Sequence, residues 1–263
     1  MGNPLGTMVI YGAGCTGRGH VGQLAHAAGY HLVFIDRDAR LVESLAAARR
    51  YTVRLVSASP REVVVDGFEA LTLSDADRVA QAVARAHLVL TAVRAENLPS
   101  VASSLAQALA RRAGQGITRP LNVIACENMV AGSSTLQALV ERELAAAHQP
   151  GLVNVGFPDA MISRVVPVPG ADPLALEAED YNEWPVDRAA YLGEGPRLPG
   201  LELVDNLPAL LERKLYMHNT GHAVCGYLAW LKGYAVMCDA IVDPWIRQAV
   251  HAAMTESGRA LIA

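Results

Sequence analysis

A glycine-rich run near the start of the chain has the spacing of a loop that cradles a phosphate group. It follows an apolar segment at residues 8–11 and reads Gly12-Ala13-Gly14-Cys15-Thr16-Gly17. In a GxGxxG loop the first glycine permits a tight turn, the second lets the backbone approach a pyrophosphate, and the third allows close helix packing. A helical pattern at residues 18–28 follows, and the N–H groups at its start favour a negative charge. The run predicts a dinucleotide site, with a glycine turn that holds no ligand as the alternative.

Residues at the ends of later apolar segments would contact the rest of the dinucleotide. Asp36 follows the second segment, close to the spacing of about 20 residues expected after Gly17. A carboxylate there accepts hydrogen bonds from the adenosine ribose and repels a 2′-phosphate, which favours NAD over NADP. Arg37 leaves this choice open, because its guanidinium could pair with a 2′-phosphate. Thr91 and Val93 end a further segment and should border the nicotinamide half of the site.

Strand-like and helix-like patterns alternate around these residues. Apolar segments rich in β-branched residues lie at 8–11, 31–35, 87–93 and 121–126, with Ala- and Leu-rich segments such as 97–112 between them. Buried parallel strands are continuously apolar, and helices cover both faces of such a sheet. Ser74 predicts the N-cap of a helix over residues 75–85. We therefore expect an α/β fold with a Rossmann-type, mostly parallel sheet.

Later segments depart from this alternation. Residues 52–57 and 62–68 have the pattern of a β-hairpin, and the Pro- and Gly-rich stretch 193–200 is typical of a linker. The remaining residues are rich in Leu, Ala and Met. We expect an NAD-binding Rossmann domain with extra strands at 1–200 and a smaller all-α substrate domain at 201–263. The final Ala260-Leu261-Ile262-Ala263 forms an uncapped helical pattern, which indicates a shortened second domain.

Composition narrows the class of partner. Apolar residues make up 52% of the 263 residues, and the net charge of −4 comes from charges mixed along the chain. This gives no basic patch for nucleic acid or a membrane surface. The four cysteines are far apart in the sequence, and no secretory signal precedes the first strand. Reduced thiols, a cytoplasmic location and a small-molecule partner are the expectation.

Three stretches resemble signatures of the polyol-specific long-chain dehydrogenases. They are Cys126-Glu127-Asn128-Met129, Arg164-Val165-Val166-Pro167, and a Lys-x4-Asn-x2-His pattern within residues 212–223. The resemblance spans nearly the whole chain and is closest to the mannitol-1-phosphate 5-dehydrogenases. It implies an NAD-dependent enzyme without a metal that interconverts a polyol, or a polyol phosphate such as mannitol 1-phosphate, and the corresponding ketose, such as fructose 6-phosphate.

The resemblance also assigns roles to four residues. It makes Lys214 the catalytic base, Asn128 and Asn219 the amides that polarise the substrate oxygen, and His222 a substrate contact. On an α-helix, at about 100° per residue, the three residues from 214 to 222 span a sector of roughly 140° and could face one cleft. A partly desolvated lysine could take the alcohol proton as hydride leaves. The alternatives are a solvated lysine and a histidine that only packs.

Three positions depart from that family. Ile162-Ser163 stands where Val-Asp is usual, and Arg94 stands where a glycine is common. Arg94 fits either an anionic substrate or an exposed loop. The shortened helical domain favours a second hypothesis, a non-catalytic NAD(H)-binding protein whose cleft is left open or is completed in a homo-oligomer. A third is a Rossmann dehydrogenase of the hydroxyacid or 6-phosphogluconate type. Lys214, Asn219 and His222 argue against the second, and the family-like stretches argue against the third.

Overall fold

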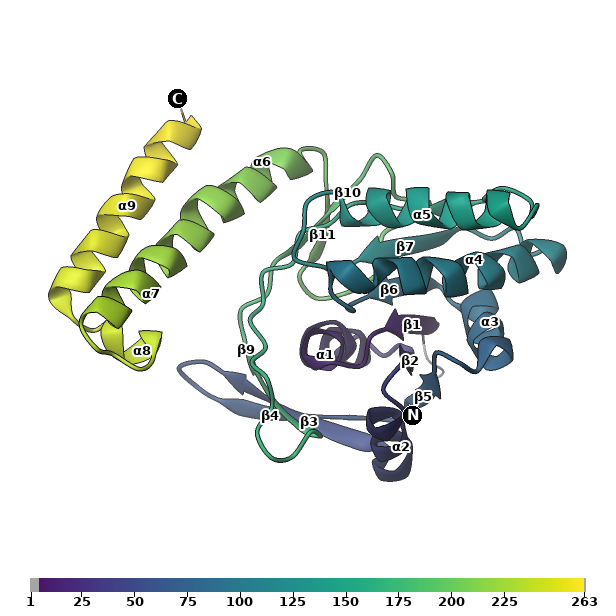
Figure 1. The fold of residues 1–263 in the computed structure, drawn as a ribbon, viewed down its shortest axis with the longest axis horizontal. Helices are drawn as coiled ribbons and strands as arrows, with labels where there is room; N and C mark the ends of the chain where they lie inside the picture. Colours follow the sequence, from purple (N-terminus) through teal and green to yellow (C-terminus); the bar gives the residue numbers. More distant parts are fainter. Residues whose placement is uncertain (1–4, 263) are drawn as a thin grey trace. The chain divides into compact units, whose positions relative to one another are not determined.

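The computed structural model describes residues 5–262, which fall into two compact units divided between Asp205 and Asn206. The first unit combines a parallel sheet with helices, and the second is helical (Figure 1). The expected fold class, a Rossmann-type α/β domain followed by a smaller all-α domain, is confirmed. No helix of the described residues is long and apolar enough to span a lipid bilayer.

A six-stranded sheet forms the centre of the first unit. Its strands are β1 (Thr7–Tyr11), β2 (His31–Asp36), β5 (Glu69–Thr72), β6 (Leu88–Thr91), β7 (Leu121–Ala125) and β8 (Val155–Gly156). They are ordered β5-β2-β1-β6-β7-β8, and each neighbouring pair is parallel. Counted within this sheet, the order is 3-2-1-4-5-6, which reverses direction between β1 and β6. Crossover helices between parallel strands produce this topology.

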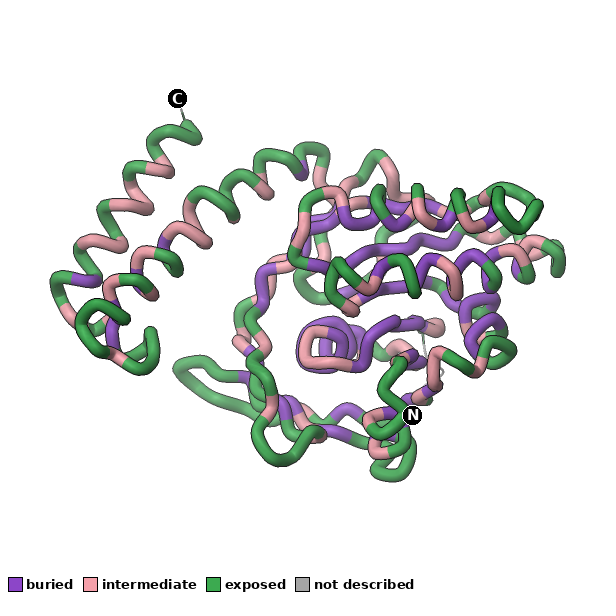
Figure 2. Tube along the Cα trace, viewed as in Figure 1, coloured by how far each residue is buried: buried purple, intermediate pink, exposed green. Residues whose placement is uncertain are grey.

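Helices cover both faces of the sheet, so its strands are buried on both sides (Figure 2). Met8 and Ile10 of β1 pack in one core cluster, and the alternating Val9 and Tyr11 pack in the other. The π-helix η1 (Gly17–Gly22), α1 (Gln23–Ala27) and α2 (Ala39–Ala48) contribute to the first cluster. The second contains α3 (Ala76–Arg85), α4 (Leu98–Gly114) and α5 (Gly132–Ala146).

Two small sheets complete the first unit. The expected hairpin is present as β3 (Arg50–Val56) and β4 (Arg61–Asp66), and β9 (Ala175–Glu179) extends it beside β3. A parallel pair consists of β10 (Trp184–Asp187) and β11 (Leu201–Val204). The prediction of a linker at residues 193–200 is wrong, because this stretch joins β10 to β11 and buries Leu198 in the core. The expected boundary at residue 200 would separate β11 from its partner strand.

The start of α3 also differs from the expectation. Ser74 is not the N-cap, and its hydroxyl donates instead to Thr72 Oγ1. Asp75 has the non-helical backbone, and its Oδ1 accepts the Arg78 N–H at 3.3 Å. Both residue types cap helices well, so the backbone conformation decides which of them does so.

The second unit consists of helices packed around a small apolar core. A continuous helical segment comprises α6 (Leu207–Arg213), the π-helix η3 (Lys214–Asn219) and α7 (Thr220–Leu231). After it come α8 (Met237–Ala240) and α9 (Pro244–Ile262). Asn206 caps α6, with its Oδ1 accepting the Ala209 N–H. The buried core is formed by Cys225, Ala229, Ala240 and Ile246.

Candidate functional site

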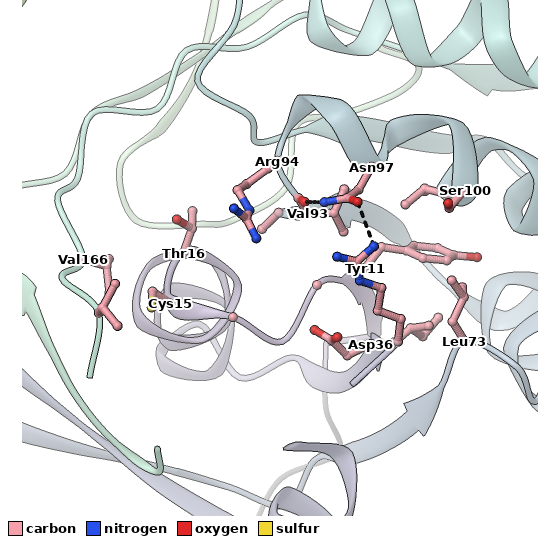
Figure 3. A pocket seen from close by; sticks show the side chains of 17 residues that line it. Tyr11, Cys15, Thr16, Asp36, Leu73, Val93, Arg94, Asn97, Ser100 and Val166 are labelled. Carbon is pink, nitrogen blue, oxygen red and sulfur yellow. Dashed lines mark hydrogen bonds between the residues drawn. The ribbon is translucent and has the colours of Figure 1, made fainter. Parts of the chain in front are cut away.

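A cavity of about 500 Å³ lies at the carboxyl edge of the six-stranded sheet (Figure 3). Its walls follow β1, β2 and β6, at the point where the strand order reverses. Dinucleotides bind in this crevice of open α/β sheets. Seven of the residues expected to bind the cofactor line the cavity: Gly12, Gly14, Cys15, Thr16, Asp36, Arg37 and Val93.

The three glycines of the loop have different environments. Gly12 has a φ of +97°, and a Cβ there would lie 2.3 Å from the Ala92 carbonyl oxygen. A Cβ on Gly17, which does not line the cavity, would lie 1.9 Å from the Gly12 carbonyl oxygen. The space beside Gly14 is open, with no atom within 4 Å of a Cβ. The outer glycines thus serve the packing of the loop itself, while the environment of Gly14 leaves room for phosphate groups.

Asp36 holds this loop as well as lining the cavity. Its Oδ2 accepts the Ala13 N–H at 2.7 Å, and its Oδ1 accepts the Asp38 N–H at 2.9 Å. A carboxylate offers about four lone-pair sites, so each oxygen can accept one further hydrogen bond. Asp36 can therefore keep the loop in place and still accept a ribose hydroxyl. The bond between Ala13 and Asp36 has no sequence signal, because it joins the loop after β1 to the end of β2.

Arg37 bonds to the start of the segment after β6. Its Nη1 donates to Asn97 Oδ1 at 2.9 Å, and Asn97 Nδ2 donates to the Val93 carbonyl oxygen at 2.6 Å (Figure 3). Asn97 ends the short 3₁₀ helix η2 (Ala95–Asn97) that leads into α4. The guanidinium has five N–H donors, so this bond leaves it able to bind a further acceptor.

Thr91 lies behind the cavity wall, which differs from its expected position at the nicotinamide half. It is fully buried, and its hydroxyl donates to Glu127 Oε1 at 3.0 Å. Glu127 also accepts the Val93 N–H and the Arg94 N–H, each at 2.8 Å. The carboxylate thus fixes the backbone that forms one wall of the cavity. Sequence reasoning missed this role, although an acidic residue directly after a buried strand was a signal for it.

Asn128 follows β7 in the first unit and is exposed. The preceding Cys126 is buried, and burial together with the neighbouring Glu127 raises the pKa of its thiol well above the ordinary value. Cys126 therefore stays a neutral packing residue, because the thiolate is the reactive form. Of residues 126–128, only Asn128 is exposed.

A buried arginine supports the glycine loop from behind. Arg18 is 2% exposed and donates to the carbonyl oxygens of Ala13 at 2.5 Å and Pro173 at 2.6 Å. Its guanidinium carbon lies 5.6 Å from the centre of the Tyr51 ring. Burial lowers the pKa of Arg18, but arginine titrates far above neutral pH and the group stays charged. Its two donors therefore connect the glycine loop at Ala13 to the segment just before β9 at Pro173.

In the second unit, a π-helical turn begins at Lys214 and ends at Asn219, where a regular α-helix was expected. On an α-helix, five residues would separate their directions by about 140°. The i to i+5 hydrogen bond of a π-helix closes a wider turn, so residues five apart come closer to alignment. Lys214 is half-buried, and this burial lowers the pKa of its ammonium. Sequence periodicity could not reveal this geometry.

His222 stands one turn after His218, and the two rings form an edge-to-face pair with centroids 4.5 Å apart. His222 Nδ1 lies 3.1 Å from the His218 carbonyl oxygen. A carbonyl oxygen can only accept, so Nδ1 carries the proton of this bond. In the neutral ring, Nε2 is then an acceptor on an exposed side chain.

Comparison with known families agrees with both units. Residues 7–200 match the mannitol dehydrogenase Rossmann domain, and residues 206–263 match the mannitol dehydrogenase C-terminal domain. The chain belongs to the mannitol dehydrogenase family. This member of the family is an NAD-dependent oxidoreductase, and the NAD(H) cofactor expected from the sequence is confirmed.

Solved structures resemble this mannitol dehydrogenase family member at the level of the fold. D-mandelate dehydrogenase with NADH and anilino(oxo)acetate has a TM-score of 0.58 and 14% identity, covering 95% of this chain and 79% of that one. A 2-dehydropantoate 2-reductase from Methylococcus capsulatus has a TM-score of 0.53 and 14% identity, and the match covers 94% of this chain and 79% of that one. Octopine dehydrogenase has a TM-score of 0.55 and 12% identity, and the match covers 88% of this chain and 57% of that one. Such identities establish a shared fold alone.

The polar residues of this mannitol dehydrogenase homologue form no metal centre in the part of the chain that the structure describes. Within residues 5–262, no group of three or more His, Cys, Asp or Glu side chains is placed to hold a metal ion. The candidate groups of this chain for proton transfer and for polarising a carbonyl are the Lys214 amine, the Asn128 and Asn219 amides and the His222 imidazole.

Proposed function

We propose that this protein interconverts a polyol, or a polyol phosphate such as mannitol 1-phosphate, and the corresponding ketose, such as fructose 6-phosphate, with NAD(H). The observation that carries the proposal is the half-buried Lys214, with its lowered pKa, on a π-turn that ends at Asn219. π-turns within helices occur frequently at functional sites. Burial also brings the amine closer to the pKa that a general base needs.

The choice of amine supports this role. The chain contains 22 lysines and arginines, of which only Lys214 and Lys232 are lysines. Arginine cannot give up its proton in a protein, whereas a buried lysine can. The Lys232 side chain is 40% exposed and lies 2.7 Å from Asp243, which favours its charged form. Burial instead lowers the pKa of Lys214, so Lys214 is the amine suited to cycle between charged and neutral forms.

The proposed reaction divides its tasks among four side chains. When bound, the nicotinamide supplies the hydride for the ketose carbonyl carbon and accepts a hydride from the polyol in reverse. The Lys214 ammonium gives its proton to the carbonyl oxygen, which becomes the hydroxyl; in oxidation the neutral amine takes that proton back. Asn128 and Asn219 donate to the oxygen while it carries negative charge. His222 Nε2 accepts from a neighbouring hydroxyl.

We expect the protein to bind NADH more tightly than NADPH, because a 2′-phosphate would meet the Asp36 carboxylate. Asp36→Asn removes the charge but keeps one oxygen acceptor for the Ala13 N–H. The preference for NADH should therefore fall by about tenfold, or about 1.4 kcal/mol, without loss of the loop. Calorimetric titration of both proteins with both cofactors measures this ratio. An unchanged ratio would remove Asp36 from cofactor selection and leave Arg37 as the residue to test.

The rates should depend on pH through Lys214. Burial lowers the pKa of this lysine, so its neutral form appears below about pH 10.4, the value for an exposed lysine. Polyol oxidation needs the neutral amine, so its kcat/KM should rise as pH increases through the lowered pKa. Ketose reduction needs the ammonium, and its kcat/KM should fall over the same range. A pH profile in each direction checks this; rates that change in the same sense would contradict it.

Purified protein should first be titrated with NADH and then assayed with fructose 6-phosphate, fructose and uronate-derived ketoses. We expect NADH binding and reduction of at least one of these ketoses, with the matching polyol oxidised by NAD. NADH binding without turnover of any of them would favour the non-catalytic NAD(H)-binding protein. The cytoplasmic location and a homo-oligomeric state remain part of this proposal, and fractionation and light scattering test them.

A further inference from the structure

The turn after β6 contains a residue whose backbone conformation suits glycine. Arg94 has φ 70° and ψ 146°, a combination that residues with a Cβ rarely adopt. Such conformations persist where the surrounding structure holds them, and they gather at binding and catalytic sites. Arg94 lines the cofactor cavity, so the unusual conformation lies in its wall.

Glu127 supplies the bonds that hold this conformation. Its Oε2 accepts the Arg94 N–H and its Oε1 accepts the Val93 N–H, both at 2.8 Å. The Thr91 hydroxyl donates to Oε1 and orients the carboxylate from the strand side. Glu127 is only 6% exposed, so water screens these bonds little. A charged acceptor with three donors fixes the two peptide groups on either side of Val93, and the Asn97 N–H bonds the Arg94 carbonyl oxygen at 3.0 Å beyond them.

The side chain of Arg94 is directed into the cavity rather than used within the fold. Figure 3 shows it among the lining residues, and 78% of it is exposed. Its contact with Glu96 measures 3.6 Å, which is longer than a hydrogen bond, and Glu96 is also exposed. The guanidinium therefore keeps donors for a ligand. A planar guanidinium suits the paired oxygens of a phosphate group.

We propose that Glu127 is a positioning residue that holds Arg94 so that its guanidinium binds a phosphate group in this cavity. Two sources share this chemistry: the cofactor pyrophosphate, and the phosphate of a phosphorylated polyol or ketose. The second source rests on the function proposed above, and the first does not.

The test compares Arg94→Gly, Arg94→Lys, Glu127→Gln and the Arg94→Gly/Glu127→Gln double variant with the parent. Glycine removes the guanidinium and tolerates a φ of 70°, so Arg94→Gly should unfold at the parent temperature or above. Lysine keeps the charge but loses the two-pronged geometry. Calorimetry gives the dissociation constant for NADH, and then those for mannitol 1-phosphate and mannitol with NADH saturating.

The single variants identify the source of the phosphate. A weakening of NADH binding by about 10- to 100-fold in Arg94→Gly, with less loss in Arg94→Lys, supports the pyrophosphate. If Arg94→Gly weakens the binding of mannitol 1-phosphate by the same factor and leaves the affinities for mannitol and NADH unchanged, the result supports the substrate phosphate. If all three ligands bind within about twofold of the parent, the proposal is overturned. If the parent binds neither polyol, the substrate source fails together with the proposed function, and NADH alone decides.

The double variant tests whether Glu127 acts through Arg94. Glu127→Gln should weaken the affected ligand by about tenfold in the parent, but by less than about twofold when residue 94 is already glycine. Equal losses in both backgrounds would reject the positioning role, because a general effect on packing would not depend on the guanidinium. If Glu127→Gln fails to fold, Thr91→Val removes one of the three donors without changing charge, and the same comparison applies to it.

Discussion

Replacement of Lys214 by alanine is expected to lower kcat by about 10² to 10⁴, the contribution of a general acid–base group, equal to about 2.7 to 5.5 kcal/mol. NADH affinity should stay at the parent value, because the cofactor cavity is lined by residues of the first unit only, whereas Lys214 belongs to the second. Steady-state kinetics of ketose reduction, together with NADH titration, separates the two effects.

Lys232→Ala provides the matched control. It removes the only other lysine, which pairs with Asp243 within the same helical unit. Asp243 keeps its hydrogen bonds from the Trp245 and Ile246 N–H groups when the lysine is removed, so turnover and NADH affinity should both match the parent. Parent-like turnover in Lys214→Ala would reject the proposed mechanism. Equal losses of turnover in the two variants would point to damage to the helical unit rather than to loss of a catalytic amine.

The amides give a second measure of the same mechanism. Asn219→Ala and Asn128→Ala should each lower kcat by about 10² to 10³, because each removes a donor to the oxygen that gains negative charge. KM should change less, since these bonds are strongest in the transition state. His222→Ala should lower kcat and also raise KM, because His222 is proposed to contact the substrate. A change confined to KM in the asparagine variants would assign them to substrate binding.

Gly14→Ala is expected to weaken NADH binding by about 10- to 100-fold while leaving the unfolding temperature unchanged. A Cβ at this position meets no atom within 4 Å, so the protein itself has room for it. The same Cβ would occupy the space through which a pyrophosphate approaches the loop. Each N–H bond lost to a charged phosphate costs about 1.5–3 kcal/mol. NADH titration and thermal unfolding of one sample measure both quantities.

Gly12→Ala is the contrasting control. Its Cβ would lie 2.3 Å from the Ala92 carbonyl oxygen, at a φ of +97° that disfavours any side chain. This variant should lose stability, by about 1–3 kcal/mol from backbone strain alone, as well as NADH affinity. If Gly14→Ala binds NADH as tightly as the parent, the pyrophosphate does not approach the loop at Gly14, and the cofactor site must be assigned to other residues of the cavity.

Much of the fold followed from local patterns. Four strands of the six-stranded sheet (β1, β2, β6 and β7), the hairpin at β3 and β4, and the helical second unit coincide closely with the predicted segments, whereas β5 does not. Buried parallel strands and crossover helices leave strong signals, because each needs a continuous or periodic apolar run. Composition alone gave a wrong prediction of a linker at 193–200. This stretch is rich in Pro and Gly, yet it packs Leu198 into the core.

The sequence by itself determined the order of elements, the glycine loop and the position of Asp36, since these depend on spacing along one short segment. Only the tertiary structure decided that Thr91 lies behind the cavity wall and that Glu127 holds the turn after β6. It also decided that a π-helical turn begins at Lys214 and ends at Asn219. The physical reason is that a side chain's role depends on which backbone groups reach it. Those groups come from neighbouring strands and from the hydrogen-bond pattern of the helix, which no local pattern specifies.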